Sequence, residues 1–287
     1  MATIMRSKEV INKILEEMNG ETGRLKEKGI VPSISFILIG DDFGSSIYVR
    51  NKKEMCAQLG FHSDTYELPQ DISEGELLKL IKNLNDDDSV DGILVQAPLP
   101  KHMDMKTILD AIDPKKDVDA FHPQNIGRVL TGDYDFVPCT PQGILEILRY
   151  YEIDIEGKNC VVVGRSNTVG KPAALLMLQE NATVTICHSR TKDLGAVTSA
   201  ADILICAIGR AKFITEDMVK EGAVVVDVGM NRNEAGKVCG DVDFQNVKEK
   251  ASYITPVPGG VGPMTVTMLM KNTLKSALLR EKRMENK

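Results

Sequence analysis

The sequence predicts an α/β fold of two α/β domains around a cleft, the second of them a doubly wound, Rossmann-type domain. Three observations lead to this prediction. A chain of 287 residues with 43% hydrophobic content is long enough for two cores. Helical and strand patterns alternate through its first half. From residue 159 onward, purely apolar strands alternate with helices, as in parallel sheets that are covered on both faces.

The first half shows a run of β-α-β units. Apolar side chains at helical spacing predict a helix over residues 7–28. A short apolar run closed by Gly40 predicts a buried strand over residues 34–39. The elements that the pattern predicts next are a helix over 45–59, an extended segment at 65–68, a helix over 73–84 and a strand over 92–97.

Residues 113–141 contain four prolines and several aspartates with little periodicity, which predicts a long connection. A long loop in a compact protein is usually functional or a linker. After it come the apolar strand segments CVVVG, ATVTICH, ADILICAIG and AVVVDVGM. We therefore expect a first domain over residues 1–137, a second over 138–264, and a C-terminal helix over 265–287 that packs back on the first.

Charge and composition exclude several classes of protein. The 35 basic and 41 acidic residues are mixed along the chain, so there is no electrostatic footprint for nucleic acid. The N-terminal residues lack an apolar stretch of signal-peptide length, and no segment reaches the ~20 apolar residues of a membrane span. We expect a cytoplasmic protein without a membrane partner.

Cysteine and histidine spacing gives no sign of a metal site. The six cysteines include no C-x-x-C pair, and Cys160, Cys187 and Cys206 lie in or beside apolar strand segments. They are expected to be reduced core thiols. The four histidines are far apart and lack helical metal-ligand spacing. We expect no structural or catalytic metal.

A glycine turn follows the first apolar strand of the second half. Gly164 and Gly170 stand with five residues between them, before a predicted helix over 173–179. A strand, a glycine turn and a helix N-terminus place backbone N–H groups against a phosphate. The spacing departs from G-x-G-x-x-G, so the glycines alone also fit a plain structural turn. The regular β-α-β context favours a dinucleotide site.

The end of the next strand favours NADP over NAD. NAD-binding domains usually carry an acidic residue there that binds the ribose hydroxyls. This chain has Cys187, His188, Ser189 and Arg190 instead. A 2′-phosphate would gain donors from Ser189 and Arg165, and Arg190 is a further candidate donor. Each arginine also fits a solvated surface position, and for Arg190 that alternative is at least equally consistent with the sequence.

A second group of candidate residues lies in the first half. Tyr48 and Lys52 are four residues apart and share a helix face, where a phenol can hold a ring while a lysine exchanges a proton. Alone, the pair also fits an exposed amphipathic surface. Gln96 favours a binding site over such a surface, because it ends a predicted strand. Ligands bind at the carboxyl ends of strands in open α/β sheets.

At this point the chain resembles the bifunctional methylenetetrahydrofolate dehydrogenase/cyclohydrolases over nearly its whole length. Six ordered motifs carry the resemblance and together are far more specific than any one of them. They are Tyr48-Val49-Arg50-Asn51-Lys52, residues 91–100, residues 116–121, residues 138–143, residues 164–172 and residues 256–265.

The resemblance implies a site residue by residue. Lys52 matches the key catalytic group, Gln96 its hydrogen-bonded partner, and Tyr48 the residue that positions the pterin. Asp119 matches the carboxylate that binds the aminopyrimidine edge, and it completes the predicted catalytic set. The residues that match cofactor contacts are Gly164, Arg165, Ser166, Ser189 and Met230. Further substrate contacts are implied for Val95, Pro258, Gly259, Gly262 and Pro263.

The implied activity is NADP-dependent oxidation of 5,10-methylenetetrahydrofolate followed by hydrolysis to 10-formyltetrahydrofolate, in the one-carbon metabolism that serves purine biosynthesis. The resemblance also implies a homodimer. Two departures lie beside proposed substrate residues: Ala97 where leucine is frequent, and Ala120 where glycine is usual. Two alternatives remain: another NADP oxidoreductase, of amino-acid or shikimate type, and a non-enzymatic NADP-binding protein.

Overall fold

The computed structural model describes residues 1–40, 43–233 and 235–286, with the side chains of residues 43–47 left out. The chain divides into two compact units. Unit 1 contains Met1–Asn12 and Pro138–Thr265, and unit 2 contains Lys13–Val137 and Val266–Lys287. No helix in the described ranges has the length and apolar character needed to cross a membrane.

The N-terminus departs from the expected boundary of residues 1–137. Residues 1–12 belong with unit 1, because β1 (Thr3–Ile4) pairs in parallel with β11 (Tyr253–Ile254). Each of these strands is two residues long, too short for an apolar alternation to predict it. The C-terminal residues Val266–Lys287 lie in unit 2.

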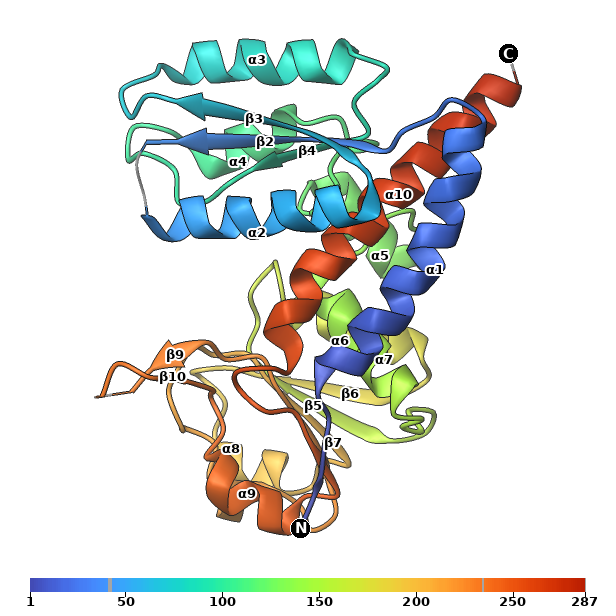
Figure 1. Cartoon of the computed structure of the whole chain (residues 1–287). Helices are drawn as coiled ribbons and strands as arrows, with labels where there is room; N and C mark the ends of the chain where they lie inside the picture. Colours follow the sequence, from blue (N-terminus) through green and yellow to red (C-terminus); the bar gives the residue numbers. More distant parts are fainter. Residues whose placement is uncertain (41–42, 234, 287) are drawn as a thin grey trace. The chain divides into compact units, whose positions relative to one another are not determined.

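Unit 2 is built on a three-stranded parallel sheet in the order β3-β2-β4. The strands are β2 (Ser33–Ile39), β3 (His62–Leu68) and β4 (Gly92–Val95). Every residue of β2 and β4 is buried, as apolar strands covered on both faces should be. Figure 1 shows α2 (Phe43–Leu59) and α3 (Glu74–Asp86) on opposite faces of this sheet.

The helix α3 illustrates how local sequence sets these elements. Ser73 is its N-cap, and the Ser73 hydroxyl and the Glu76 carboxylate form a reciprocal capping box. One turn further, the apolar side chains that recur at helical spacing, Leu77, Ile81 and Leu84, are buried in the core against β2 and β4. The predicted helix over 73–84 is confirmed.

Two long helices complete unit 2. The later turns of α1 (Ser7–Glu27) and α10 (Val261–Glu285) are joined by Arg24, whose guanidinium donates to both carboxylate oxygens of Glu281 at 2.6 and 2.8 Å. Arg280 similarly donates to both oxygens of the buried Asp91, at 2.8 and 2.9 Å, just before β4. The first pair fixes α10 against α1, and the second fixes it beside the sheet of its own unit.

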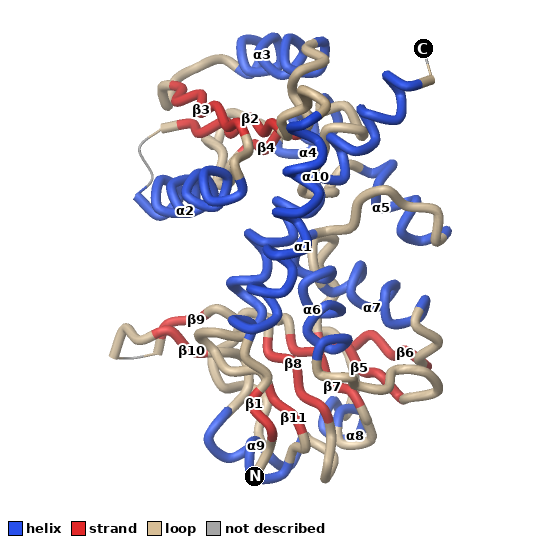
Figure 2. Tube along the Cα trace, turned by 45° about the vertical axis from the view of Figure 1, so that its right-hand side comes forward, coloured by secondary structure: helices blue, strands red, loops and turns tan. Residues whose placement is uncertain are grey.

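Unit 1 contains a six-stranded parallel sheet in the order β1-β11-β8-β7-β5-β6. Its four predicted strands are confirmed as β5 (Asn159–Val163), β6 (Thr183–Cys187), β7 (Ile203–Cys206) and β8 (Val224–Asp227). Figure 2 shows α6 (Cys139–Tyr150) and α7 (Gly170–Gln179) on one face, with α8 (Leu194–Thr198) and α9 (Phe244–Lys250) on the other. The sheet is therefore doubly wound, as predicted.

The core of unit 1 holds the predicted strand cysteines. Cys160, Cys187 and Cys206 are fully buried, and none forms a disulfide. Burial raises the pKa of the Cys160 thiol to about 12, so it stays protonated at neutral pH. The predicted burial of these three thiols in the core is confirmed.

The prediction of a structureless connection over residues 113–141 is wrong. This segment contains α5 (Pro123–Thr131) and the start of α6, and α4 (Met105–Ala111) precedes it. Pro123 is at the first position of α5 and Gly132 closes it with a left-handed φ of 79°. Proline at the start and glycine at the end of a helix give the same sequence signal as a loop. The short elements η1 (Glu216–Met218), β9 (Asn231–Arg232) and β10 (Val238–Cys239) were also not predicted.

Candidate active site

A lysine and a glutamine from different elements meet in unit 2. Lys52 Nζ, on α2, donates a 2.9 Å hydrogen bond to Gln96 Oε1, directly after β4. Gln96 Nε2 in turn donates to the Ala97 carbonyl at 2.8 Å. Both side chains are half-buried. The second bond fixes which end of the amide faces the ammonium, so Lys52 has an acceptor that adds no charge.

The sheet register explains how Gln96 reaches this position. Val95 pairs with Ile37 of the central strand, and the Gln96 N–H continues the ladder by donating to the Ile37 carbonyl at 2.9 Å. Val95 is buried, so Gln96 is the first side chain past the strand that reaches the surface. Tyr48 lies one turn before Lys52 on α2 and is 45% exposed. An exposed phenol and a partly buried ammonium therefore share one helix.

Asp119 lies in a turn that a neighbouring carboxylate builds. Asp117 is buried and accepts hydrogen bonds from the His122 N–H at 2.7 Å and Asn125 Nδ2 at 2.9 Å. Burial raises the pKa of Asp117, against these donors. Asp117 thus has a structural, turn-capping role, whereas Asp119, within the same turn, is half-buried.

The turn also shows why glycine suits position 120. Ala120 has a φ of 60°, in the left-handed region that favours glycine. The segment is held from α10 by Asn272, a buried residue that sequence reasoning missed. Its amide donates to the Val118 carbonyl at 2.8 Å and to the Val137 carbonyl at 3.0 Å. An asparagine within a helical apolar pattern was the available signal, because a buried amide needs partners.

In unit 1, the glycine turn follows β5 at the point where neighbouring strands lie on both sides of it. Gly164 has a φ of 133°, and a Cβ there would overlap the Ala207 carbonyl oxygen. A Cβ at Gly170 would overlap the Gly164 carbonyl oxygen. The Ser166 hydroxyl accepts hydrogen bonds from the N–H groups of Val169 and Gly170, at 3.1 and 3.2 Å, where α7 begins. Both glycines are therefore required by close backbone approach.

The end of β6 is a polar turn without a carboxylate. The His188 N–H donates to Thr191 Oγ1 at 2.8 Å, and the Arg190 N–H donates to His188 Nδ1 at 3.1 Å. Ser189 and Arg190 are exposed here, as are Arg165 and Ser166 in the glycine turn. These side chains offer donors at the carboxyl edge of β5 and β6, which pair in parallel.

The remaining predicted residues of unit 1 lie in two segments. Met230 follows β8 and is 59% exposed, and a Cβ placed on Gly262 would lie 3.4 Å from its Cε. Gly259 accepts hydrogen bonds at its carbonyl from the Ser7 N–H and hydroxyl, at 3.0 and 3.2 Å. Pro258 and Pro263 are exposed. Met230 and Gly262 are thus brought together by the fold of this unit.

Sequence reasoning missed two buried carboxylates beside Met230. Asp227 ends β8 and Asp241 lies before α9; they are 3% and 0% exposed. Burial raises the pKa of Asp227 to about 6, although backbone N–H donors oppose the shift. The available signal was Asp227 within the apolar run AVVVDVGM, where a charged residue is unusual.

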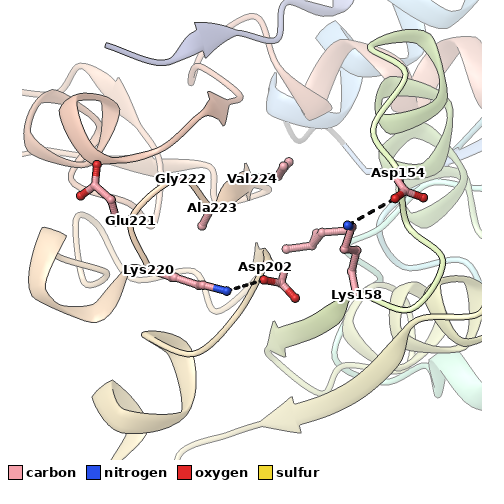
Figure 3. Close-up of a pocket in the computed structure, with 9 residues that line it drawn as sticks. Asp154, Lys158, Asp202, Lys220, Glu221, Gly222, Ala223 and Val224 are labelled. Carbon is pink, nitrogen blue, oxygen red and sulfur yellow. Dashed lines mark hydrogen bonds and ion pairs between the residues drawn. The ribbon is translucent and has the colours of Figure 1, made fainter.

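One pocket of unit 1 lies away from these residues. Figure 3 shows this pocket at the amino ends of β7 and β8. Its volume is about 210 Å³. Its charged side chains pair with one another: Lys220 with Asp202 at 2.5 Å and Lys158 with Asp154 at 3.3 Å. Ligands of open α/β sheets bind at the opposite, carboxyl edge. We therefore do not place the active site in this pocket.

These features define a class of protein. A glycine turn at the carboxyl edge of a doubly wound sheet and a lysine–glutamine pair at the carboxyl end of a strand on a separate α/β unit define a two-domain, nucleotide-dependent enzyme.

Comparison with known families makes the class specific. Residues 5–119 match the catalytic domain of tetrahydrofolate dehydrogenase/cyclohydrolase, and residues 138–281 match the NAD(P)-binding domain of the same enzyme. The chain belongs to the tetrahydrofolate dehydrogenase/cyclohydrolase family. The family, fold class and enzyme activities predicted from the sequence are thereby confirmed.

Individual relatives agree over nearly the whole chain. The bifunctional protein FolD of Oceanobacillus iheyensis is 56% identical over 96% of this chain and 97% of the relative. The crystal structure of the bifunctional FolD enzyme of Campylobacter jejuni has 50% identity and a TM-score of 0.95, covering 98% and 100% of the two chains. The Trypanosoma brucei enzyme, solved with NADP and an inhibitor, has 37% identity and a TM-score of 0.91, covering 97% and 98%.

A similarity in fold alone accounts for one alternative from the sequence analysis, the shikimate-type oxidoreductase. Shikimate dehydrogenase from Aquifex aeolicus is 14% identical with a TM-score of 0.52, covering 87% of this chain and 97% of that one. The strand and helix pattern is therefore shared with the shikimate-type enzymes considered above. What separates the two is the match of residues 5–119 and 138–281 to the tetrahydrofolate dehydrogenase/cyclohydrolase family.

Proposed function

We propose that this chain oxidises 5,10-methylenetetrahydrofolate to 5,10-methenyltetrahydrofolate with NADP and hydrolyses that product to 10-formyltetrahydrofolate. The observation that carries the proposal is the 2.9 Å hydrogen bond between Lys52 and Gln96 at the carboxyl end of β4. It supplies a proton-exchanging group with a neutral partner, in a chain of the dehydrogenase/cyclohydrolase family.

The substrate roles follow from what each side chain can offer. Tyr48 presents an exposed phenol that holds the pterin ring, and Asp119 accepts hydrogen bonds from its aminopyrimidine edge. Lys52 exchanges the proton, and Gln96 orients it. Further contacts with the folate are assigned to Val95, Pro258, Gly259, Gly262 and Pro263.

The cofactor roles fall to unit 1. Gly164 and Gly170, where backbone segments approach closely, open and close the turn that would hold the pyrophosphate, and Ser166 lies beside it at the N-terminus of α7. Arg165 and Ser189 donate to the 2′-phosphate, and Met230 meets the nicotinamide end. NADP is favoured over NAD because β6 ends without a carboxylate, and the Trypanosoma brucei relative is solved with NADP.

The mechanism divides between orientation and proton transfer. NADP, when bound, accepts the hydride. The chain's part in that step is to hold the donor carbon in place through Tyr48 and Asp119. In the hydrolysis, Lys52 Nζ exchanges a proton with the attacking water or the folate nitrogen. Gln96 keeps the ammonium directed without adding a charge that would hold its proton.

We also propose that the protein is a cytoplasmic homodimer that does not bind nucleic acid. The mixed charges along the chain and its formal charge of −6 support the last point. Purine biosynthesis is the proposed use of the product. Light scattering on the purified protein would test the dimer: a monomer mass at micromolar concentration would contradict it.

A spectrophotometric assay tests the function directly. Purified protein is mixed with methylenetetrahydrofolate and either NADP or NAD, and NADPH and the methenyl intermediate are followed separately. We expect turnover with NADP far above that with NAD, and hydrolysis of added methenyltetrahydrofolate. Turnover only with shikimate or an amino acid would favour the other oxidoreductase class. NADP binding without any turnover would favour a non-enzymatic role.

A further inference from the structure

The Asp241 carboxylate gathers four N–H donors from two separate loops of unit 1. Its Oδ2 accepts hydrogen bonds from the Ile208 and Gly209 N–H groups at 2.7 and 3.1 Å. Its Oδ1 accepts from the Arg210 N–H at 2.8 Å and from Asn231 Nδ2 at 2.9 Å. Three successive backbone N–H groups form a concave anion site, which here is filled by a side chain of the protein itself.

Asp227 fixes Asp241 from the other side. The Asp227 carboxylate accepts hydrogen bonds from the N–H groups of Gly229 at 2.9 Å, Asp241 at 2.9 Å and Val242 at 3.0 Å. A Cβ on Gly229 would overlap the Asp241 carboxylate, and a Cβ on Gly240 would overlap that of Asp227. The two carboxylates are thus enclosed by backbone in a single arrangement.

Burying these two carboxylates costs free energy, so a role in stability alone does not explain the arrangement. Both carboxylates are buried, and every donor named above is a neutral backbone or amide N–H. Burying carboxylates without a cation costs free energy that an apolar core would avoid. The arrangement instead fixes the positions of two loops, because one side chain holds both of them through four directed hydrogen bonds.

The two loops lie at the carboxyl edge of the sheet, where a dinucleotide binds in this fold. Residues 208–210 follow β7, and residues 229–231 follow β8, its hydrogen-bonded neighbour. Met230, the residue proposed to meet the nicotinamide end, lies between Gly229, held by Asp227, and Asn231, held by Asp241. Its backbone position is therefore set by the carboxylate pair.

We propose that Asp241 is a positioning residue for the nicotinamide half of the cofactor, acting through residues 208–210 and the Met230 backbone. The inference rests on the proposed function and deepens it, because it divides cofactor recognition into an adenine half, served by the glycine turn and Ser189, and a nicotinamide half. None of the hydrogen bonds that Asp241 forms within the described residues reaches Arg165, Ser166 or Ser189.

Asp241→Asn is the direct test. One oxygen becomes an NH₂ group, which points a donor at backbone N–H donors, so the loops must move. We expect NADP affinity, measured by calorimetry, to fall about tenfold, and hydride transfer to fall by ~10²-fold, the effect of a ~1 Å misplacement. Binding of 2′,5′-ADP, which lacks the nicotinamide half, should stay within about twofold of the unmutated protein, because its subsite is untouched.

Cyclohydrolase activity provides an internal control, because it consumes methenyltetrahydrofolate without NADP. It should stay within about twofold in the folded variant. Asp202→Asn is the matched control variant: Asp202 also accepts a backbone N–H, from Asn159 at 2.9 Å, but at the amino edge of the same sheet, in the pocket of Figure 3. It should leave both the NADP affinity and the ratio of the two activities unchanged.

Asn231→Ala keeps the test decisive if Asp241→Asn does not fold. It removes one partly buried hydrogen bond to Asp241 and should weaken NADP binding in the same direction, by ~3-fold or more. Unchanged NADP affinity in the folded variants, or an equal loss of 2′,5′-ADP binding, would overturn the inference. Failure of the unmutated protein to oxidise methylenetetrahydrofolate with NADP would instead contradict the proposed function.

Discussion

Gln96 presents its amide oxygen to Lys52 Nζ at 2.9 Å while its amide nitrogen is held by the Ala97 carbonyl at 2.8 Å. The two bonds leave the amide one orientation, because reversing it would set the NH₂ group against the ammonium and one carbonyl against another. Lys52 thus meets a fixed, uncharged acceptor. A neutral acceptor directs the ammonium without placing a negative charge beside it.

Gln96→Glu tests the need for a neutral partner. A carboxylate of the same size would form an ion pair with Lys52 and hold its proton, and it would lose the bond to the Ala97 carbonyl. We expect cyclohydrolase turnover at neutral pH to fall by at least ~10-fold. Gln245→Glu is the control, because the exposed Gln245 on α9 also accepts a hydrogen bond from a lysine, Lys248, at 2.8 Å. Full activity in Gln96→Glu would rule out this role.

Arg165→Ala tests cofactor choice. Arg165 is exposed in the glycine turn, free to reach a 2′-phosphate from its position after β5. Its loss should weaken NADP binding by about 1.5–3 kcal/mol, the usual worth of a charge-assisted hydrogen bond, with little change toward NAD. Calorimetric titration with both cofactors measures the difference, and Arg190→Ala shows whether the second arginine contributes. Equal kinetic efficiency with NADP and NAD in the unmutated protein would contradict the prediction.

The parts of the fold that the sequence predicted are those with a local pattern. The buried strands β2 and β5 are continuous apolar runs, and α3 carries both a capping box and an apolar stripe. The two-residue strands β1 and β11 have no such pattern, because they form only when segments 250 residues apart in the chain pair. The residue pattern of one short segment therefore does not reveal its partner strand.

The residues of the candidate site also differ in whether a local sequence pattern could predict them. Gln96 was predictable because it ends an apolar strand, and the glycine turn because it joins a strand to a helix. Asp241 and Asn272 were not, because their importance lies in donors and acceptors far along the chain, such as Ile208 and Val118. A polar residue in a loop or helix has many ordinary uses, and only its burial marks it out.

Glu152→Gly should stabilise the protein. Glu152 follows α6 with a φ of 53°, and it is exposed. A left-handed residue costs about 1–2 kcal/mol, and glycine's extra chain entropy offsets about half of it. We expect the free energy of unfolding to rise by about 0.5–1 kcal/mol, measured by denaturant titration. Glu156→Gly, at an exposed position without a positive φ, should lower it instead. A loss of stability in Glu152→Gly would contradict the strain argument.

Glu281 should make unit 2 lose stability as the pH becomes acidic. Arg24 and then Lys28 lower the pKa of Glu281 from 4.5 to about 2. A folded-state pKa below the unfolded value gives stability that is present above pH ~4.5 and is lost as the pH falls toward 2. Thermal melts should therefore show a smaller fall in Tm over this window for Glu281→Gln than for the unmutated protein. Glu285→Gln, at an exposed partner of Lys28, is the control. Parallel curves for Glu281→Gln and the unmutated protein would contradict the prediction.

Lys52→Arg separates charge from proton exchange at the proposed catalytic residue. If the ammonium only held the substrate by its charge, arginine would replace it with modest loss, since it keeps the charge and adds donors. If Lys52 exchanges a proton, arginine must fail, because a guanidinium does not give up its proton near neutral pH. We expect cyclohydrolase turnover to fall by ~10²-fold or more while hydride transfer is partly retained.

The variant should accumulate the methenyl intermediate, whose absorbance can be followed beside that of NADPH in the same reaction. Lys53→Arg is the matched control, one residue further along α2 and exposed, and it should leave both signals unchanged. Because arginine also reaches Gln96 with a donor, a folded Lys52→Arg protein keeps the contact between α2 and the end of β4, so a lost activity would not reflect a lost contact. Normal hydrolysis of added methenyltetrahydrofolate by this variant would show that Lys52 is not the proton carrier.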